Sequence, residues 1–269
     1  MKNVTKKQHY IPRMLLKHFT TFYIPLKKPL IYQYDKIKCI ERLVDINDIC
    51  CENYLYEIRD ESGVISKKEI NLIENAFACF ESAWNKIIDK IILKENITQE
   101  DRCLLGVLLV LQLLRTPEVM KFTSDWLYDT APYIYKQITR NEADKYMKLS
   151  SFIFDKVTPE TNFILNILIQ NILVNRDIVI YHSDYGFILN EQRPVLCMNL
   201  FEDCSIKDCL WLLPITKNHC VAAINGNAVS DIDINKNLTR FINLQNFQND
   251  GRFVYGSESF FEKNTEISG

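Results

Sequence analysis

The sequence contains few of the glycines and prolines that are common in loops and linkers, and it lacks a long uncharged apolar run of the kind that spans a membrane. It has seven glycines and eight prolines in 269 residues, while hydrophobic residues make up 47% and charged residues 25%. This composition excludes a disordered or fibrous chain and predicts a globular protein with a sizeable core. The longest uncharged runs, 103–114 and 161–175, predict no transmembrane segment, because the first is too short and the second contains Asn and Gln.

Motifs that identify common enzymes and metal proteins are also missing. The chain has no glycine-rich phosphate loop, no H-E-x-x-H and no G-x-S-x-G sequence. Its nine cysteines include no C-x-x-C pair, the adjacent Cys50 and Cys51 suit neither a structural zinc nor an ordinary disulfide, and His182-x-Asp184 lacks a third ligand in register. With no secretory signal, we expect a cytoplasmic protein with reduced thiols, no metal site and no cofactor.

The net charge of −2 gives no overall signature of nucleic-acid binding, but the charge is unevenly distributed. Residues 1–38 carry nine Lys or Arg against a single acid, and the remainder carries 23 against 33. Such a basic segment predicts a contact with the phosphates of a nucleic acid or a nucleotide. The alternative is that the segment docks on the acidic remainder of the chain. No membrane partner is expected.

Hydrophobic periodicity predicts a single composite α+β domain, residues 1–269, without a long linker. Residues 1–65 should form an N-terminal hook and a small β-hairpin. Pro12 suits the first turn of a short helix, and residues 30–34 and 39–44 should be the paired strands. A third short strand is expected at 53–58.

Residues 66–175 should form a central bundle of helices. Apolar residues recur at every third or fourth position from Ile70 to Ile91, which predicts one broad buried stripe. Thr98 has the features of an N-cap for the next helix, in which 103–114 is apolar all round and should be buried. Two Thr-Pro-Glu triplets should each open a further helix, beginning near 117 and at 163–174.

The last third of the chain has a different pattern of residues. Residues 176–257 contain short β-branched runs bounded by turns, which predict a C-terminal antiparallel or mixed sheet. Within this region residues 235–247 should form a helix and 252–255 a last strand. The polar tail at 258–269 should be frayed.

The chain carries a distinctive opening motif, Gln8-His9-Tyr10-Ile11-Pro12-Arg13, followed by Leu16-Lys17-x-Phe19. Further motifs are Ile31-Tyr32-x-Tyr34-Asp35, Gln112-Leu113-Leu114-Arg115-Thr116-Pro117, Leu212-Leu213-Pro214-Ile215-Thr216 and Arg252-Phe253-Val254-Tyr255. Together they resemble the bacterial family known as domain of unknown function 4238, over residues 7–257. Glu74 and Asn243 fall where that family carries an acid and a closing Asn. The resemblance implies a fold and a bacterial or prophage setting, but no reaction.

One stretch departs from the family pattern. The family often has a Ser-Asp-Asn-Pro turn before a strand, whereas this chain has Asn190-Glu191-Gln192-Arg193-Pro194. The Asp is absent, so the role of that carboxylate is expected here only if Glu191 replaces it.

Five residues are candidates for catalysis: His9, Arg13, Glu74, Gln112 and Arg115. An imidazole with a pKa near ~6.5 suits a general acid or base, and two guanidinium groups suit a clamp on a phosphate or carboxylate. Glu74 would be the carboxylate partner of His9 or Arg13, and Gln112 lies one turn before Arg115 on the same helix face. The alternative for each is structural: a buried His that bonds a carbonyl, an Arg that caps helix carbonyls, and a surface Glu.

Four residues are expected to bind the substrate around this centre: Gln8, Tyr10, Asn243 and Arg252. Gln8 would orient His9 or hold an anion, and Tyr10 places an aromatic ring beside it. Asn243 and Arg252 would close the site, or alternatively satisfy backbone groups at a helix–strand junction. His18 is expected at the surface of its short helix.

Two hypotheses about function follow. In the first, the chain is an enzyme that acts on a phosphate-bearing substrate, with His9 as general acid or base and with Arg13 and Arg115 holding the anion. Its concrete form is a metal-independent nuclease or transferase effector in phage defence or a toxin–antitoxin pair. In the second, the chain is a non-catalytic binding or sensor module in which the same polar cluster is a structural lock. Both require the hook to fold against the end of the helix that carries Arg115.

Overall fold

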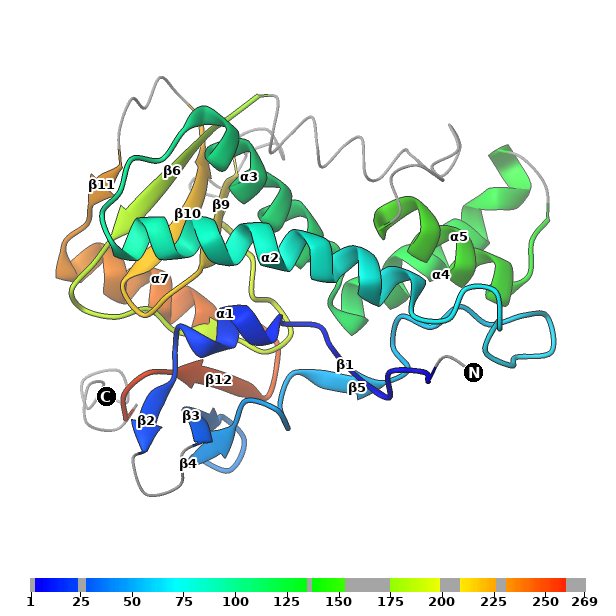
Figure 1. The fold of residues 1–269 in the computed structure, drawn as a ribbon, viewed down its shortest axis with the longest axis horizontal. Coiled ribbons are helices and arrows are strands. Elements are labelled where there is room, and N and C mark those ends of the chain that lie inside the picture. The colour runs from blue at the N-terminus through cyan, green and yellow to red at the C-terminus, as the bar shows by residue number, and fades with distance from the viewer. Residues whose placement is uncertain are drawn as a thin grey trace.

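The computed structural model describes residues 3–23, 28–134, 137–152, 175–198, 209–225 and 231–259 of the 269-residue chain. The helix predicted at 163–174 and most of the predicted tail at 258–269 lie outside the described residues. Within the described ranges, helices and strands occur in an α+β arrangement, which confirms the predicted fold class (Figure 1). The largest hydrophobic core cluster joins the N-terminal hook, the long helices and strands of both large sheets.

The hook consists of strand β1 (Lys7–His9) and the short helix α1 (Arg13–Lys17), which Pro12 precedes as N-cap. β1 pairs antiparallel with β5 (Cys51–Asn53), so that His9 lies opposite Cys51. The third strand therefore lies at 51–53 and not at the predicted 53–58. The physical reason is a turn at Tyr54, whose φ of 59° ends the extended conformation.

The predicted hairpin is present as β3 (Lys28–Asp35) and β4 (Ile40–Asp45). Segments distant in the sequence extend it into a five-stranded sheet: β2 (Thr21–Tyr23), β12 (Phe253–Gly256) and β7 (Leu189–Asn190). β12 pairs antiparallel with β3, with Val254 opposite Tyr34. The last strand of the described chain thus completes the sheet that the N-terminal hairpin begins, a pairing that no local pattern predicts.

Four long helices form the middle of the chain: α2 (Leu72–Ile92), α3 (Gln99–Leu114), α4 (Pro117–Ile134) and α5 (Arg140–Phe152). The predicted N-cap of α3 is confirmed, because the Thr98 side chain accepts from the Asp101 N–H and the Asp101 carboxylate accepts from the Thr98 N–H. α4 begins at Pro117, as predicted. In Figure 1, α4 and α5 lie at one end of the molecule and α2 runs towards the other.

None of the described helices is by itself long and apolar enough to cross a membrane. α3 and the first part of α4, 117–132, pass that length and composition test together, although they are bent by 74°.

A second five-stranded sheet lies at the far end of α2 (Figure 1). Its strands, in spatial order, are β11 (Ile232–Asp233), β6 (Asp177–His182), β10 (His219–Ile224), β9 (Leu210–Pro214) and β8 (Leu196–Met198). The buried helix α3 contacts β6, β9 and β10 on one side and α2 on another. Helix α7 (Lys236–Gln248) follows β11 and leads to β12, so it connects the two sheets.

Candidate functional site

The hook lies against the C-terminal end of α3, as the sequence predicts. Arg115, which is 2% exposed, donates from Nη2 to the His9 carbonyl at 2.7 Å, from Nη1 to Glu81 Oε1 at 3.0 Å and from Nε to Tyr56 Oη at 3.3 Å. Its guanidinium also lies 4.0 Å from the centre of the Phe77 ring. All three guanidinium nitrogens of Arg115 therefore donate to protein groups. We call this set of contacts the hook lock.

Two buried amides strengthen the hook lock. Gln8 is fully buried and donates from Nε2 to Glu57 Oε1 at 2.7 Å. Gln112, also fully buried, donates from Nε2 to the Tyr10 carbonyl at 2.8 Å, while its Oε1 has no hydrogen-bond partner. Gln112 thus holds the backbone of the hook against α3, and Gln8 holds it against the segment at Tyr56 and Glu57, because a buried polar group is costly unless it is paired.

The electrostatics of the hook favour a neutral His9. Burial, with further contributions from Arg13 and Arg115, lowers the pKa of His9 to about 4, against an opposing hydrogen bond with the backbone of Ile46. Burial raises the pKa of Glu74 to about 7, although the nearby Arg115 opposes this shift. An imidazole with so low a pKa is a weak base at neutral pH. The catalytic role of His9 stays a prediction: its Nε2 is buried without a hydrogen-bond partner, and the hook lock contacts its backbone carbonyl rather than its ring.

The structure does not give Arg13 and Arg115 a common open face. Arg13 is exposed at the start of α1, whereas Arg115 is buried beneath the hook. The predicted anion clamp would therefore need Arg115 to leave Glu81, the His9 carbonyl and its stacking partner, and leaving a buried charge unpaired is expensive.

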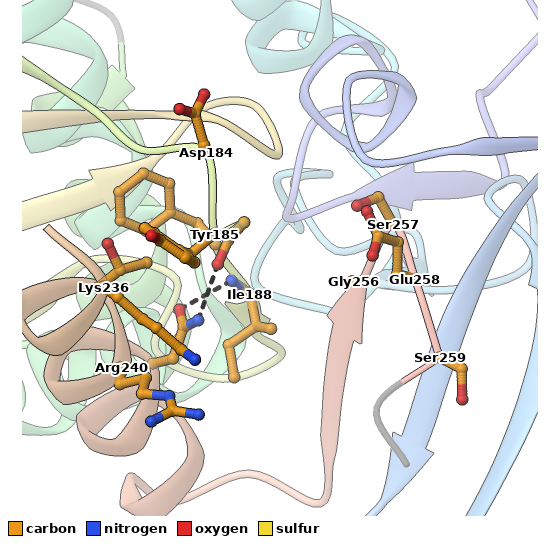
Figure 2. Close-up of a pocket in the computed structure, with 13 residues that line it drawn as sticks. Asp184, Tyr185, Ile188, Lys236, Arg240, Gly256, Ser257, Glu258 and Ser259 are labelled. Carbon is orange, nitrogen blue, oxygen red and sulfur yellow. Dashed lines mark hydrogen bonds between the residues drawn. The ribbon is translucent and has the colours of Figure 1, made fainter. Parts of the chain in front are cut away.

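Arg252 and Asn243 form their hydrogen bonds with groups outside the hook lock. Arg252 donates from Nε and Nη2 to Asp35 Oδ2, at 3.0 and 2.6 Å, which ties β12 to β3 and holds the pKa of Asp35 well below its ordinary value. Asn243 accepts from the Ile188 N–H at 3.2 Å and donates to the Gly186 carbonyl at 2.9 Å. Each of these side chains therefore forms hydrogen bonds that link its own segment to another part of the chain. Asn243 also lines the hollow drawn in Figure 2.

A different cluster of titratable side chains lines a cleft of about 620 Å³ between the end of α2 and one edge of the second sheet. His182 at the end of β6 lies opposite His219 at the start of β10, with ring centres 5.1 Å apart. The parallel strand β11 places Asp233 beside His182. We call this the histidine cleft; its charged and titratable lining residues are Lys94, Glu95, His182, Asp184, Tyr185, His219, Asp231 and Asp233.

His182 is held between two carboxylates. Its Nδ1 lies 3.0 Å from Asp233 Oδ1 and its Nε2 lies 3.7 Å from Asp184 Oδ1. The side chain of His182 is 32% exposed, so solvent and a ligand can reach it. An Asp behind Nδ1 favours the tautomer that carries its proton on Nδ1, which leaves the Nε2 lone pair free to accept one.

His219 is neutral and has a defined tautomer. Burial, followed by the neighbouring His182 and Lys94, lowers the pKa of His219 to about 4. Its Nδ1 lies 2.9 Å from Thr216 Oγ1, and that oxygen already accepts the N–H groups of Asn218 and His219. The Thr216 hydroxyl proton is thus left to donate to Nδ1, so that His219 carries its own proton on Nε2.

Lys94 and Asp231 add a positive and a negative charge to the lining of the histidine cleft. Lys94 follows the end of α2 with φ at 57°, a conformation that glycine adopts more cheaply. Asp231 pairs with Arg102 at 2.8 Å. Within the described ranges, no group of three or more His, Cys, Asp or Glu side chains is arranged to hold a metal ion.

The family comparison covers nearly the whole chain, because residues 7–260 match the model described as "Protein of unknown function (DUF4238)". The chain belongs to the DUF4238 family. No curated protein and no solved structure shows a significant match to it. The resemblance carried by the opening motif and its companions is therefore confirmed, and the family assigns no reaction.

The stretch in which this DUF4238 protein departs from the family turn also lies at the hook. Asn190 Oδ1 accepts the backbone N–H groups of Gln192 and Arg193, each at 2.9 Å, so an amide oxygen closes this turn. Glu191 accepts from the Tyr10 hydroxyl at 3.2 Å, and burial raises the pKa of its carboxyl. Tyr10, predicted to bind substrate, is thus bonded to a residue of the divergent turn.

Sequence reasoning missed the histidine cleft. His182, His219 and Asp233 have no common spacing, and only the register of β6, β10 and β11 brings them together. The one local signal in the sequence is His182-x-Asp184, which has no third ligand in register. His18, predicted at the surface, is half-buried, and its carbonyl accepts from the Lys217 N–H at 3.3 Å in the turn before His219.

Proposed function

We propose that this DUF4238 protein is an enzyme that carries out general acid–base chemistry in the histidine cleft. The observation that supports this most directly is the pair of His182 Nδ1 and Asp233 Oδ1, 3.0 Å apart at the wall of an open hollow. A carboxylate behind an imidazole fixes the tautomer and the orientation of the ring, which is what a general base needs.

Each side chain of the histidine cleft has its own role in the proposed reaction. Nε2 of His182 takes a proton from the substrate, and Asp233 and Asp184 stabilise the imidazolium that forms. Neutral His219 donates from Nε2–H to the oxygen on which negative charge develops, and Lys94 adds a positive charge at the rim. A positioned acid or base of this kind contributes about 10²–10⁴-fold to a reaction rate.

The substrate class that we propose is a phosphate ester. The basic segment at residues 1–38 supports this choice. The narrower hypothesis is a nuclease or transferase effector in which His182 removes the proton of a sugar hydroxyl. Such an effector would act on RNA or a nucleotide in the cytoplasm, in phage defence or as a toxin.

The test compares the turnover of an RNA oligonucleotide, a set of nucleotides and a chromogenic phosphodiester by wild type, His182→Asn and Asp233→Asn. Asp48→Asn is the matched control, because Asp48 is likewise an exposed Asp bonded to another side chain, that of Lys7, at 2.6 Å. We expect a loss of about 100-fold or more for His182→Asn, about tenfold for Asp233→Asn and none for Asp48→Asn. Unchanged turnover by His182→Asn would overturn the proposal, and no turnover of any phosphate ester by wild type would overturn the substrate class.

The hook lock favours a second candidate, a non-catalytic binding or sensor module. Arg115, Gln112 and Gln8 direct their donors at protein groups rather than at a cleft. A module of this kind binds its ligand without converting it, and His182→Asn then changes affinity alone. Turnover that depends on His182 excludes this candidate.

A further inference from the structure

A second hollow, of about 460 Å³, adjoins the histidine cleft. Asp184 and Tyr185 line both hollows, so the loop that carries these residues is a wall of each. Figure 2 shows this second hollow between α7 and the segment that follows β12. A molecule of modest size can therefore occupy both hollows by lying across the Tyr185 loop.

Two cations of α7 line this hollow from successive turns. Lys236 and Arg240 are four residues apart and so lie on the same face of the helix, and Figure 2 shows both side chains directed into the hollow. Lys236 Nζ lies 5.9 Å from the centre of the Tyr185 ring. Asp184 points away from both cations in the same view.

The two hollows differ in charge. Four carboxylates line the histidine cleft against a single lysine, so the cleft by itself repels a phosphate dianion. The second hollow is more balanced: Lys236 and Arg240 line it together with Asp184 and Glu258, and the hydroxyl side chains of Ser257 and Ser259 lie on its other wall. A guanidinium, an ammonium and hydroxyl donors are the groups that bind phosphate oxygens best.

We propose that this second hollow, the cation hollow, binds a non-reacting phosphate of the substrate whose reacting group lies in the histidine cleft. The inference rests on the proposed function, because it assigns the substrate of the same site. Glu258 also lines the cation hollow, on the wall opposite α7. Its carboxylate competes with a phosphate for the two cations, so removing its charge strengthens phosphate binding.

The probe is inorganic phosphate, titrated at constant ionic strength into the full chain and followed by amide chemical shifts. Lys236→Ser/Arg240→Ser lowers the affinity for phosphate about tenfold or more, and Glu258→Gln raises it. The matched control is Lys86→Ser/Lys121→Ser, which removes the same charge from exposed positions on α2 and α4. Equal affinity in wild type and Lys236→Ser/Arg240→Ser overturns the inference, as does an equal loss in the control pair, which would mean non-specific attraction.

One further variant separates the inference from the proposed function. His182→Asn should bind phosphate with the affinity of wild type while it loses turnover. If phosphate binding depends on Lys236 and Arg240 but turnover does not depend on His182, the cation hollow stands and the proposed reaction fails. If His182→Asn abolishes turnover while the double variant leaves both phosphate affinity and KM unchanged, the reaction stands and the cation hollow fails.

Discussion

Replacing Arg115 tests whether the cluster beneath the hook is a lock or a binding site. Arg115→Met keeps an apolar stem beside Phe77 but removes the donors to the His9 carbonyl, Glu81 and Tyr56. Removing one partner of a buried ion pair costs about 3–5 kcal/mol. The side chain of Glu81 is 26% exposed, so water compensates part of this loss, and we expect about 3–4 kcal/mol.

The assay is urea unfolding followed by far-ultraviolet circular dichroism at neutral pH. Arg13→Met is the control, since Arg13 is exposed on the same hook and its loss should cost less than about 0.5 kcal/mol. The double variant Arg115→Met/Glu81→Leu should be less destabilised than the sum of the two single variants, because it leaves no unpaired carboxylate. A cost below about 1 kcal/mol for Arg115→Met would refute the lock, and intact folding with lost substrate binding would restore the anion clamp.

Two further predictions concern Glu74 and Lys94. Because the pKa of Glu74 is raised to about 7, the folded state holds its proton where the unfolded state has lost it, so stability falls as pH rises from about 4.5 to 7. Glu74→Gln should remove this fall and be more stable than wild type at pH 8 by on the order of 2 kcal/mol; an unchanged pH slope in urea unfolding contradicts the assignment. Lys94→Gly relieves a positive φ and should stabilise the fold by about 0.5 kcal/mol. Because it also removes a nearby positive charge, it should raise the pKa of His219, which can be measured from imidazole proton shifts. A destabilised variant would show that the Lys94 side chain supports the helix end.

Local patterns were enough to predict most elements of this chain. The apolar stripe of α2, the Thr98 cap of α3 and Pro117 at the start of α4 each depend on residues within a turn or two of one another. Interactions of such short range depend on sequence spacing alone, so the sequence reports them directly.

Gln112 and Arg115 end an apolar helix, so the sequence predicted that they need polar partners near the hook, but it did not predict that Arg115 is buried. Which partners they find was not predictable. The His9 carbonyl and Tyr56 reach Arg115 from 106 and 59 residues away, and a hydrogen bond to a backbone carbonyl leaves no trace in side-chain identity.

The sequence by itself determined the α+β class, the helices α2, α3, α4 and α7 with the Thr98 cap of α3, and the closeness of the hook to the end of α3, but it did not predict α5. Only the tertiary structure decided that β12 completes the N-terminal sheet and that His182, His219 and Asp233 meet at one sheet edge. The physical reason is that strand pairing joins residues through backbone hydrogen bonds, which any side chain permits, so the register that brings distant residues together depends on how the whole core packs.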